Sequence, residues 1–196
     1  MQVEIMNRGI ILCKAKPEDF EEMLNIEREH FSDYERMLSI GDFTKWHSHN
    51  KDMFFVVKKA SVNQVLGFLI IVPIKETLYK KIANGLASDI FDFNQEEVEE
   101  IFYSDYFFLQ QVCVTKKANT RARVMLIGAC FRLIYENGGK FTLTSPITEE
   151  GKKVVSNVGF RPLTQAEYNG KKQEIYWLKT EYNKFAKYAK LAGFHI

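Results

Sequence analysis

The chain has 196 residues, of which 46% are hydrophobic and 27% are charged, and its formal net charge is +2. This length is sufficient for one domain with a core of its own. The near-neutral charge argues against a dedicated nucleic-acid-binding protein, which usually carries a strong basic excess. No apolar run reaches the ~18 residues of a membrane span, and the N-terminus lacks the order of a signal peptide. We expect a cytoplasmic protein with one domain over residues 1–196 and no membrane or nucleic-acid partner.

The periodicity of apolar residues before residue 75 predicts a strand, two helices and a two-stranded hairpin. Pro17, followed by two acids, is typical of a helix start. We expect the second helix to be interrupted at Gly41-Asp42. The predicted ranges of these elements are 10–15, 17–31, 33–46, 53–59 and 65–74.

Residues 75–105 resemble an insertion and become strongly acidic in their second half. We predict two short helices there, around Asn84-Gly85. The acids form either a solvated helix face or a surface that attracts a cationic partner.

A strand, a helix, a strand, a helix, a strand and a C-terminal helix are predicted after the insertion. Their ranges are 106–114, 120–136, 141–144, 148–158, 174–178 and 182–192. The unit from 106 to 144 should be a parallel crossover. The whole order indicates an α/β (α+β) fold, in which a central mixed antiparallel and parallel sheet carries helices on both faces. The basic, amphipathic C-terminal segment, residues 181–196, is expected to pack on the domain or on a second subunit.

The segment from Tyr106 to Ile134 is the most informative part of the chain. An apolar strand leads into a basic loop, and the loop leads into an amphipathic helix. Four of the eight residues from Lys116 to Arg123 are basic, whereas residues 82–115 contain no Lys or Arg. Helix N-termini bind anions, so this arrangement suits a phosphate-bearing ligand. A plain strand-to-helix connection with solvated basic residues is the alternative.

The three cysteines, Cys13, Cys113 and Cys130, are far apart and lie among apolar residues. They are expected to be reduced and buried rather than to form a disulfide framework or a metal site.

The order of these elements and several local phrases resemble the GNAT superfamily of acyl-CoA-dependent N-acetyltransferases. ILCKAKPEDFEEMLNIE is similar to the opening strand and helix of that family, and QVLGFLIIVPI to its second hairpin strand. VCVTKKANTRARVMLIG falls where the family carries its cofactor loop, and VVSNVGFRPL where a helix precedes its last hairpin. The resemblance covers nearly the whole chain outside the acidic insertion and the C-terminal helix.

The resemblance implies that acetyl-CoA is a co-substrate and that the loop holds its pyrophosphate. Where the family has Gln/Arg-x-x-Gly-x-Gly/Ala, this chain has Asn119, Ala122 and Val124, so the loop is degenerate. Cationic side chains of the same loop would compensate, since guanidinium groups bind phosphate well. The cofactor-binding residues implied are Val112, Cys113, Val114, Asn119, Thr120, Arg121, Ala122, Arg123 and Val124.

The implied function is transfer of an acetyl group to a primary amine by direct attack within a ternary complex. The acceptor would be a small-molecule or peptide amine, and the acidic insertion suggests a cationic one; a homodimer is possible. The alternative is a catalytically impaired GNAT-like module that binds or regulates. The altered loop favours it, as does Val155, which stands where many members have a catalytic Tyr.

The side chains that would perform catalysis are not evident, because the strand offers Gln110 and Gln111 where some members have a Glu base. Tyr103, Tyr106 and His47 are candidate substitutes. Each has a simpler interpretation, as a core aromatic or a surface histidine. Cys113 is expected to be an inert buried thiol.

Overall fold

The computed structural model of the protein describes residues 5–7, 9–31, 37–116, 118, 120–168 and 170–193. The contacts group into two compact units that are each built from separated stretches of chain. Unit 1 consists of Met1–Ile70, Gln111–Leu133 and Tyr182–Ile196, and unit 2 of Ile71–Gln110 and Ile134–Glu181. A single domain over the whole chain stays a prediction.

The described residues contain eight strands, six α-helices and four 3₁₀ turns. The strands are β1 Ile5–Asn7, β2 Ile10–Lys14, β3 Phe54–Lys59, β4 Gln64–Ile74, β5 Tyr106–Val114, β6 Phe141–Thr144, β7 Arg161–Tyr168 and β8 Lys171–Lys179. The helices are α1 Phe20–Phe31, α2 Ile40–His49, α3 Glu76–Ala83, α4 Thr120–Glu136, α5 Glu149–Asn157 and α6 Tyr182–Ala192. The 3₁₀ turns are Pro17–Asp19, Lys51–Met53, Ile90–Asp92 and Gln95–Glu97.

The strands form one mixed sheet in the order β1-β2-β3-β4-β5-β6-β8-β7. The pairs from β1 to β4 are antiparallel, as are β6–β8 and β7–β8. β5 and β6 are parallel, with Tyr106 opposite Phe141 and Leu109 opposite Thr144. The predicted mixed sheet, the hairpin of β3 and β4 and the parallel crossover are therefore confirmed.

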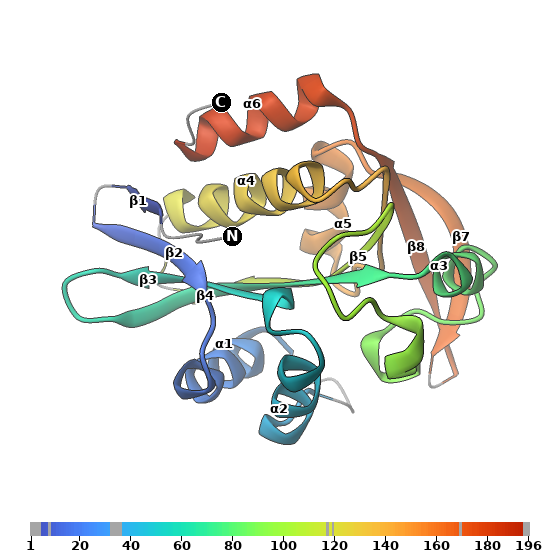
Figure 1. The fold of residues 1–196 in the computed structure, drawn as a ribbon, viewed down its shortest axis with the longest axis horizontal. Helices are drawn as coiled ribbons and strands as arrows, with labels where there is room; N and C mark the ends of the chain where they lie inside the picture. The colour runs from blue at the N-terminus through green and yellow to red at the C-terminus, as the bar shows by residue number, and fades with distance from the viewer. Residues whose placement is uncertain are drawn as a thin grey trace. The chain divides into compact units, whose positions relative to one another are not determined.

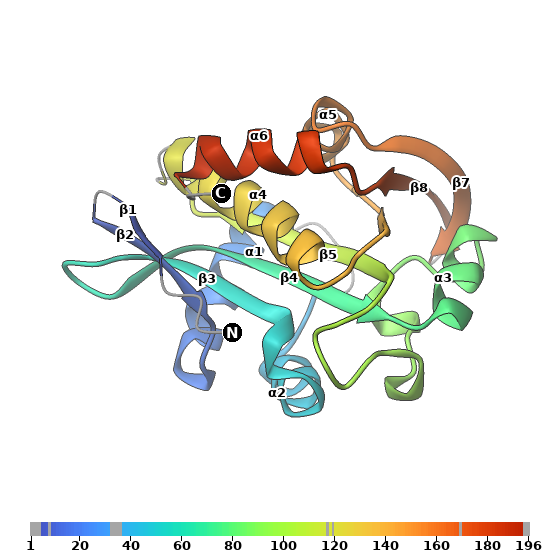
Figure 2. The ribbon, with the colours of Figure 1, turned by 45° about the horizontal axis from the view of Figure 1, so that its top comes forward.

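Helices cover both faces of the sheet in unit 1. α1 and α2 lie on one face, and α4 and α6 on the other (Figure 1; Figure 2). On the first face, the ring of Phe43 in α2 lies 5.5 Å from Phe20 and 5.9 Å from Phe54. On the second face, Phe131 of α4 stacks on Tyr188 of α6 at 4.8 Å. Aromatic burial of this kind supplies much of the stabilisation of a core.

A buried ion pair fixes the start of α1 to β3. Asp19 and Lys58 lie 2.6 Å apart, with side-chain exposures of 5% and 8%. Asp19 also accepts a hydrogen bond from the backbone N–H of Lys16 at 3.0 Å, which caps the turn that leads into α1. Pro17 occupies the first position of that turn, as the sequence predicts. The carboxylate therefore positions the helix and compensates a buried cation.

Gly67 brings β4 close to β5 within unit 1. A Cβ atom at Gly67 would lie 2.6 Å from the carbonyl oxygen of Cys113 and 2.7 Å from Cγ1 of Val114. Beyond the strand, the N–H of Thr115 donates to the carbonyl of Leu66 at 2.9 Å. Because the first obstacle is backbone, any side chain at this position would displace the end of β5.

Unit 2 is built on the first half of β5 with β6, β8 and β7. A row of aromatic rings crosses it. Tyr79 of α3 lies 4.4 Å from Tyr106, which lies 6.1 Å from Phe141, and Phe141 lies 6.3 Å from Trp177. Figure 1 shows α3 beside β7, and α5 joins β8 through the 3.1 Å ion pair of Lys152 with Glu174.

The predicted bounds of the second helix were wrong. α2 begins at Ile40, and Gly41-Asp42 lies in its first turn rather than interrupting it. Ser39 caps the helix by accepting from the N–H of Asp42 at 3.1 Å, and the Asp42 carboxylate accepts from the N–H of Ser39 at 2.9 Å. This reciprocal capping box determines the start. The earlier part of the predicted helix, residues 33–36, lies outside the described residues.

The insertion was also predicted with one helix too many. Its first half is α3, but its acidic second half has only the 3₁₀ turns at Ile90–Asp92 and Gln95–Glu97. Asp89 and Asn94 cap these turns instead of starting longer helices.

β1 and β7 were not assigned as separate strands from the sequence; β7 completes the hairpin with β8.

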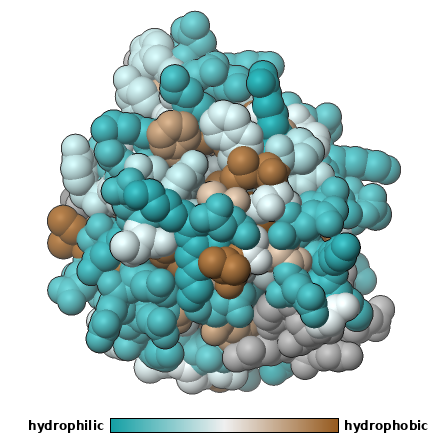
Figure 3. All heavy atoms as spheres, turned by 90° about the vertical axis from the view of Figure 1, so that its right-hand side faces the viewer, coloured by the Kyte–Doolittle hydropathy of each residue, from teal (hydrophilic) through white to brown (hydrophobic). Residues whose placement is uncertain are grey.

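The surface carries scattered apolar side chains. Leu86, Ile101 and Leu191 are each more than 60% exposed. On the face drawn in Figure 3, hydrophilic atoms predominate and the apolar side chains form small separate groups. The suggested homodimer stays a prediction. In the described part of the chain, no helix is both long and apolar enough to cross a membrane.

Removing the charge of Asp19 is expected to destabilise the protein. Asp19→Asn keeps an oxygen for the cap but leaves Lys58 as a buried, uncompensated cation. We expect the free energy of unfolding, measured with urea, to fall by about 3–5 kcal/mol. The control is Glu18→Gln, whose carboxylate is 66% exposed and lies 3.9 Å from Lys16, so its loss should have little effect. Equal small effects of the two changes would contradict this role of the buried pair.

Adding one methyl group at Gly67 is expected to disturb the end of β5. Gly67→Ala should lower the free energy of unfolding by about 1–3 kcal/mol, the usual cost of overpacking. Gly41→Ala is the matched control, because its Cβ would meet only the Ser39 hydroxyl, at 3.5 Å, and a helical Ala is favoured over Gly. Urea unfolding of both variants measures the difference; a Gly67→Ala protein as stable as Gly41→Ala would refute the close contact.

Candidate active site

The basic loop that is predicted to bind a phosphate group lies in unit 1, where it joins β5 to α4. α4 begins at Thr120, as predicted. Lys117 and Asn119 lie outside the described residues, so the roles expected of them stay predictions. Among the others, Lys116 and Arg123 are exposed and Arg121 is half-exposed. Cationic side chains therefore surround the first turn of a 17-residue helix, whose N–H groups carry partial positive charge.

The residues that depart from the family pattern face in different directions. The side chain of Ala122 is fully buried, at 0% exposure. Its methyl group therefore packs into the core and does not cover the exposed end of the helix. Val124 is half-buried, so part of its side chain reaches the surface. Of the two described residues that differ from the family's loop pattern, Ala122 and Val124, only Val124 is partly exposed.

The last turn of α1 is bonded to the end of β5 and to the start of the loop. The Glu27 carboxylate accepts from the side-chain amide of Gln111 at 3.1 Å. Nε2 of His30 lies 2.6 Å from the carbonyl oxygen of Val114. The Glu29 carboxylate accepts from the backbone N–H of Lys116 at 2.9 Å. Three residues of one helix turn thus determine where the chain leaves β5.

Exposure changes sharply along the second half of β5. Val112 is 37% exposed, whereas Cys113 and Val114 are 4% and 6% exposed. Burial raises the pKa of the Cys113 thiol, and the charge of Glu27 raises it further. The thiol is therefore protonated at neutral pH and unsuited to be a nucleophile, as expected for an inert cysteine. Burial likewise raises the pKa of Cys130 to about 12, and the described cysteines are all free thiols.

The three candidate catalytic side chains occupy different surroundings. His47 is half-buried in unit 1, where its ring lies 5.3 Å from Phe20 and 6.0 Å from Phe54. Tyr106 is part of the aromatic row of unit 2. Tyr103, also in unit 2, is 63% exposed and lies where a Cβ on Gly138 would approach its ring. Their described contacts are aromatic or steric, so catalytic roles for them stay predictions.

Much of the acidic segment stabilises its own turns. The Asp92 carboxylate accepts from the N–H of Ser88 at 2.9 Å, and that of Asp89 accepts from the N–H of Phe91 at 3.1 Å. Glu97 lies 3.6 Å from the ammonium of Lys81, and Asp105 pairs with Lys140 at 2.7 Å. These contacts reduce the number of carboxylates available to attract a cationic partner.

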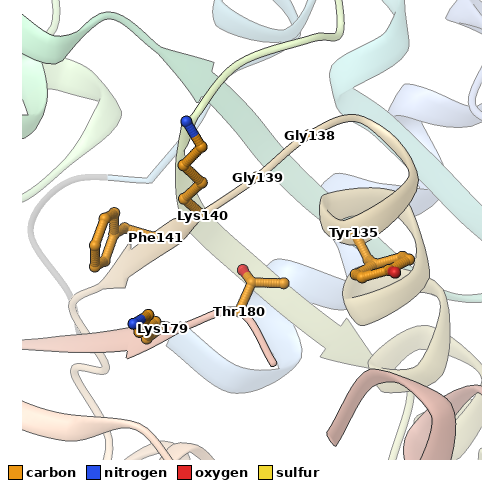
Figure 4. A pocket seen from close by; sticks show the side chains of 7 residues that line it. All are labelled: Tyr135, Gly138, Gly139, Lys140, Phe141, Lys179 and Thr180. Carbon is orange, nitrogen blue, oxygen red and sulfur yellow. The ribbon is translucent and has the colours of Figure 1, made fainter. Parts of the chain in front are cut away.

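Unit 2 contains a separate shallow pocket of about 350 Å³ (Figure 4). Its lining residues are Tyr135, Gly138, Gly139, Lys140, Phe141, Lys179 and Thr180. The backbone N–H groups of Gly138, Gly139 and Thr180 already donate to carbonyls of Tyr135, Ile134 and Lys140. In Figure 4 the side chain of Lys140 points away from Lys179 and Thr180. The pocket therefore offers few polar groups to a ligand.

Glu27 is the residue that the sequence analysis missed. Phe20, Met23, Leu24 and Phe31 mark the apolar stripe of α1, and Glu27 falls within that stripe. It is 5% exposed. A carboxylate at a core position of an amphipathic helix was the available signal, because such a group requires a polar partner in the interior.

Within the described residues, no group of three or more His, Cys, Asp or Glu is placed to hold a metal ion.

No protein-family model matches the sequence, and no curated protein matches it. Solved structures do match. Ard1 from Thermoplasma volcanium is 11% identical with a TM-score of 0.62, and covers 88% of this chain and 99% of its own. A GNAT-family acetyltransferase from Bacillus anthracis is 12% identical with a TM-score of 0.59, covering 90% and 98%. The yncA protein of Salmonella typhimurium, solved with its cofactor acetyl-CoA, is 10% identical with a TM-score of 0.58, covering 89% and 96%. The chain therefore has the fold of the GNAT superfamily.

Proposed function

We propose that this protein is an N-acyltransferase that moves an acetyl group from acetyl-CoA to a primary amine by direct attack in a ternary complex. The observation that carries the proposal is the position of the basic loop within a GNAT fold. The loop joins β5 to the N-terminus of α4, and structures that share this fold include one solved with acetyl-CoA. A strand-to-helix connection with exposed cations is suited to a pyrophosphate.

The residues present fit a phosphate-bearing co-substrate. Arg121 and Arg123 would bind phosphate oxygens, and the first N–H groups of α4 would add backbone donors. Arg121 is half-exposed, and within the described residues its guanidinium forms no ion pair. Because the methyl group of Ala122 is buried, it leaves the exposed end of the helix unobstructed. The altered loop thus retains the features that anion binding requires.

The acyl chemistry would take place along the second half of β5. Acetyl-CoA supplies the activated acyl group when bound. Backbone groups of Val112 to Val114 would orient the thioester, and an N–H of this strand would stabilise negative charge on its carbonyl oxygen. The raised pKa of Cys113 disfavours an acyl-enzyme on this thiol, which supports direct attack by the amine. An amine that is protonated at neutral pH must first lose a proton to the protein or to water.

Acetyl-CoA is expected to raise the thermal stability of the protein. A ligand that binds only the folded state at 100 times its Kd adds about 2.7 kcal/mol to the free energy of unfolding. Thermal unfolding with increasing acetyl-CoA measures the effect. Adenosine, which lacks the pyrophosphate, is the control. The absence of any shift at millimolar acetyl-CoA would refute the proposal. A shift without turnover of any amine would favour the binding or regulatory module instead.

Replacing Arg121 is expected to weaken acetyl-CoA binding. A hydrogen bond to a charged group contributes about 1.5–3 kcal/mol, and the low end applies to a half-exposed guanidinium. Arg121→Gln should therefore raise the Kd for acetyl-CoA about tenfold. Arg161→Gln is the control, because Arg161 is an exposed arginine of β7 in unit 2. Calorimetric titration measures both; equal affinities would contradict the role of Arg121.

A further inference from the structure

Glu27 and Gln111 form a buried polar pair in unit 1 that has an unfilled hydrogen-bonding position. Nε2 of Gln111 donates to Oε1 of Glu27 at 3.1 Å. An ionised carboxylate can only accept hydrogen bonds, so the amide atom that faces Glu27 must be the nitrogen. The remaining polar atom of the amide is the oxygen, Oε1 of Gln111. That oxygen is buried and has no hydrogen-bond partner among the described residues. A buried acceptor left unsatisfied costs about 1–3 kcal/mol, so its retention calls for a donor.

The pair lies beside the strand at which acyl transfer is proposed. Gln111 immediately precedes the exposed Val112 in β5. The charge of Glu27 acts on the Cys113 thiol. Gln111 is itself partly exposed, whereas Glu27 is buried beneath it. A donor that reached Oε1 of Gln111 would therefore approach a negative charge at the second half of β5.

The group that suits both atoms is a primary ammonium. It has three N–H donors, enough for the amide oxygen and the carboxylate together, and its charge is opposite to that of Glu27. A hydroxyl has one donor and no charge. A buried carboxylate is also a suitable proton acceptor, because transfer of the proton converts a pair of buried charges into two neutral groups.

We propose that Glu27 and Gln111 bind the ammonium group of the acceptor and that Glu27 takes its proton. This inference rests on the proposed acyltransferase function and names its acceptor class, a cationic primary alkylamine. In the step, one N–H bond of the ammonium breaks and an O–H bond forms on Glu27, and the electron pair stays on nitrogen. The products are a neutral amine and a neutral carboxylic acid, which later releases the proton to water. Gln111 is a positioning residue that orients the carboxylate and the nitrogen.

The first test compares Glu27→Gln with Glu21→Gln, an exposed acid of the same helix. Turnover is measured with acetyl-CoA and the best amine of a panel of primary alkylamines. Loss of a proton acceptor typically costs 10²–10⁴-fold, so we expect kcat/KM for the amine to fall at least 100-fold in Glu27→Gln. It should be unchanged in Glu21→Gln. The Kd for acetyl-CoA, measured by calorimetry, should stay the same in both variants.

The second test does not require turnover. The side-chain amide resonances of Gln111, assigned by their loss in Gln111→Ala, are followed by NMR during titration with butylamine at pH 7. We expect them to shift with butylammonium, but not with butanol, and to stop shifting in Glu27→Gln. If Glu27→Gln does not fold, Gln111→Leu replaces it in the turnover test, because it removes the unpaired oxygen at similar volume. It should then raise the KM for butylamine at least tenfold, and an unchanged KM would overturn the inference.

The outcomes distinguish this inference from the proposed function. Turnover by Glu27→Gln within twofold of the parent protein, or equal shifts with butanol, would overturn the inference and leave the acyltransferase intact. A protein that binds no acetyl-CoA would instead overturn the proposed function, and the butylamine titration would still decide whether the pair binds an ammonium.

Discussion

The contact between the last turn of α1 and the end of β5 is the constraint on which the candidate site depends. His30 and Glu29 bond the carbonyl of Val114 and the N–H of Lys116, the acceptor and donor on either side of the point where β5 ends. α1 is in turn fixed at its start by the buried pair of Asp19 and Lys58. Since α1 is held at both ends, the direction in which the chain leaves β5 toward α4 follows from a rigid helix rather than from the loop itself.

Under the proposed function, this constraint would allow a loop with altered residues to bind an anion. In the family pattern, small residues allow the backbone to approach a pyrophosphate closely. Here Ala122 turns its methyl group into the core, so the added atom lies on the side of the helix away from solvent. The position of the helix N-terminus then depends on α1, and in the proposed function Arg121 and Arg123 would supply charge. Val124 also differs from the family's loop pattern, and its side chain is partly exposed.

In our proposal, the same helix turn would supply the proton acceptor that the strand lacks. An amide such as Gln111 cannot serve as a base, but it bonds to the carboxylate of Glu27, which we propose as the proton acceptor. The pairing of Glu27 with Gln111 divides the task between a helix and a strand, and the nearby thiol of Cys113 stays protonated because burial and the charge of Glu27 both raise its pKa. The proposed site would separate the binding of phosphate, at the start of α4, from the deprotonation of the amine, beside β5.

The sequence by itself determined the elements that have strong periodicity and clear ends. The ranges predicted for β5, α4, β6 and α6 agree with the structure, because apolar repeats and terminal glycines are local signals. It failed at the start of α2, where a capping box decides, and in the acidic segment, where carboxylates cap short turns. Only the tertiary structure decided which polar side chains meet: Glu27 and Gln111 are 84 positions apart, and neither periodicity nor composition relates them. A buried carboxylate is visible in the sequence as an exception to the apolar stripe of α1, but its partner is fixed by the packing of α1 against β5.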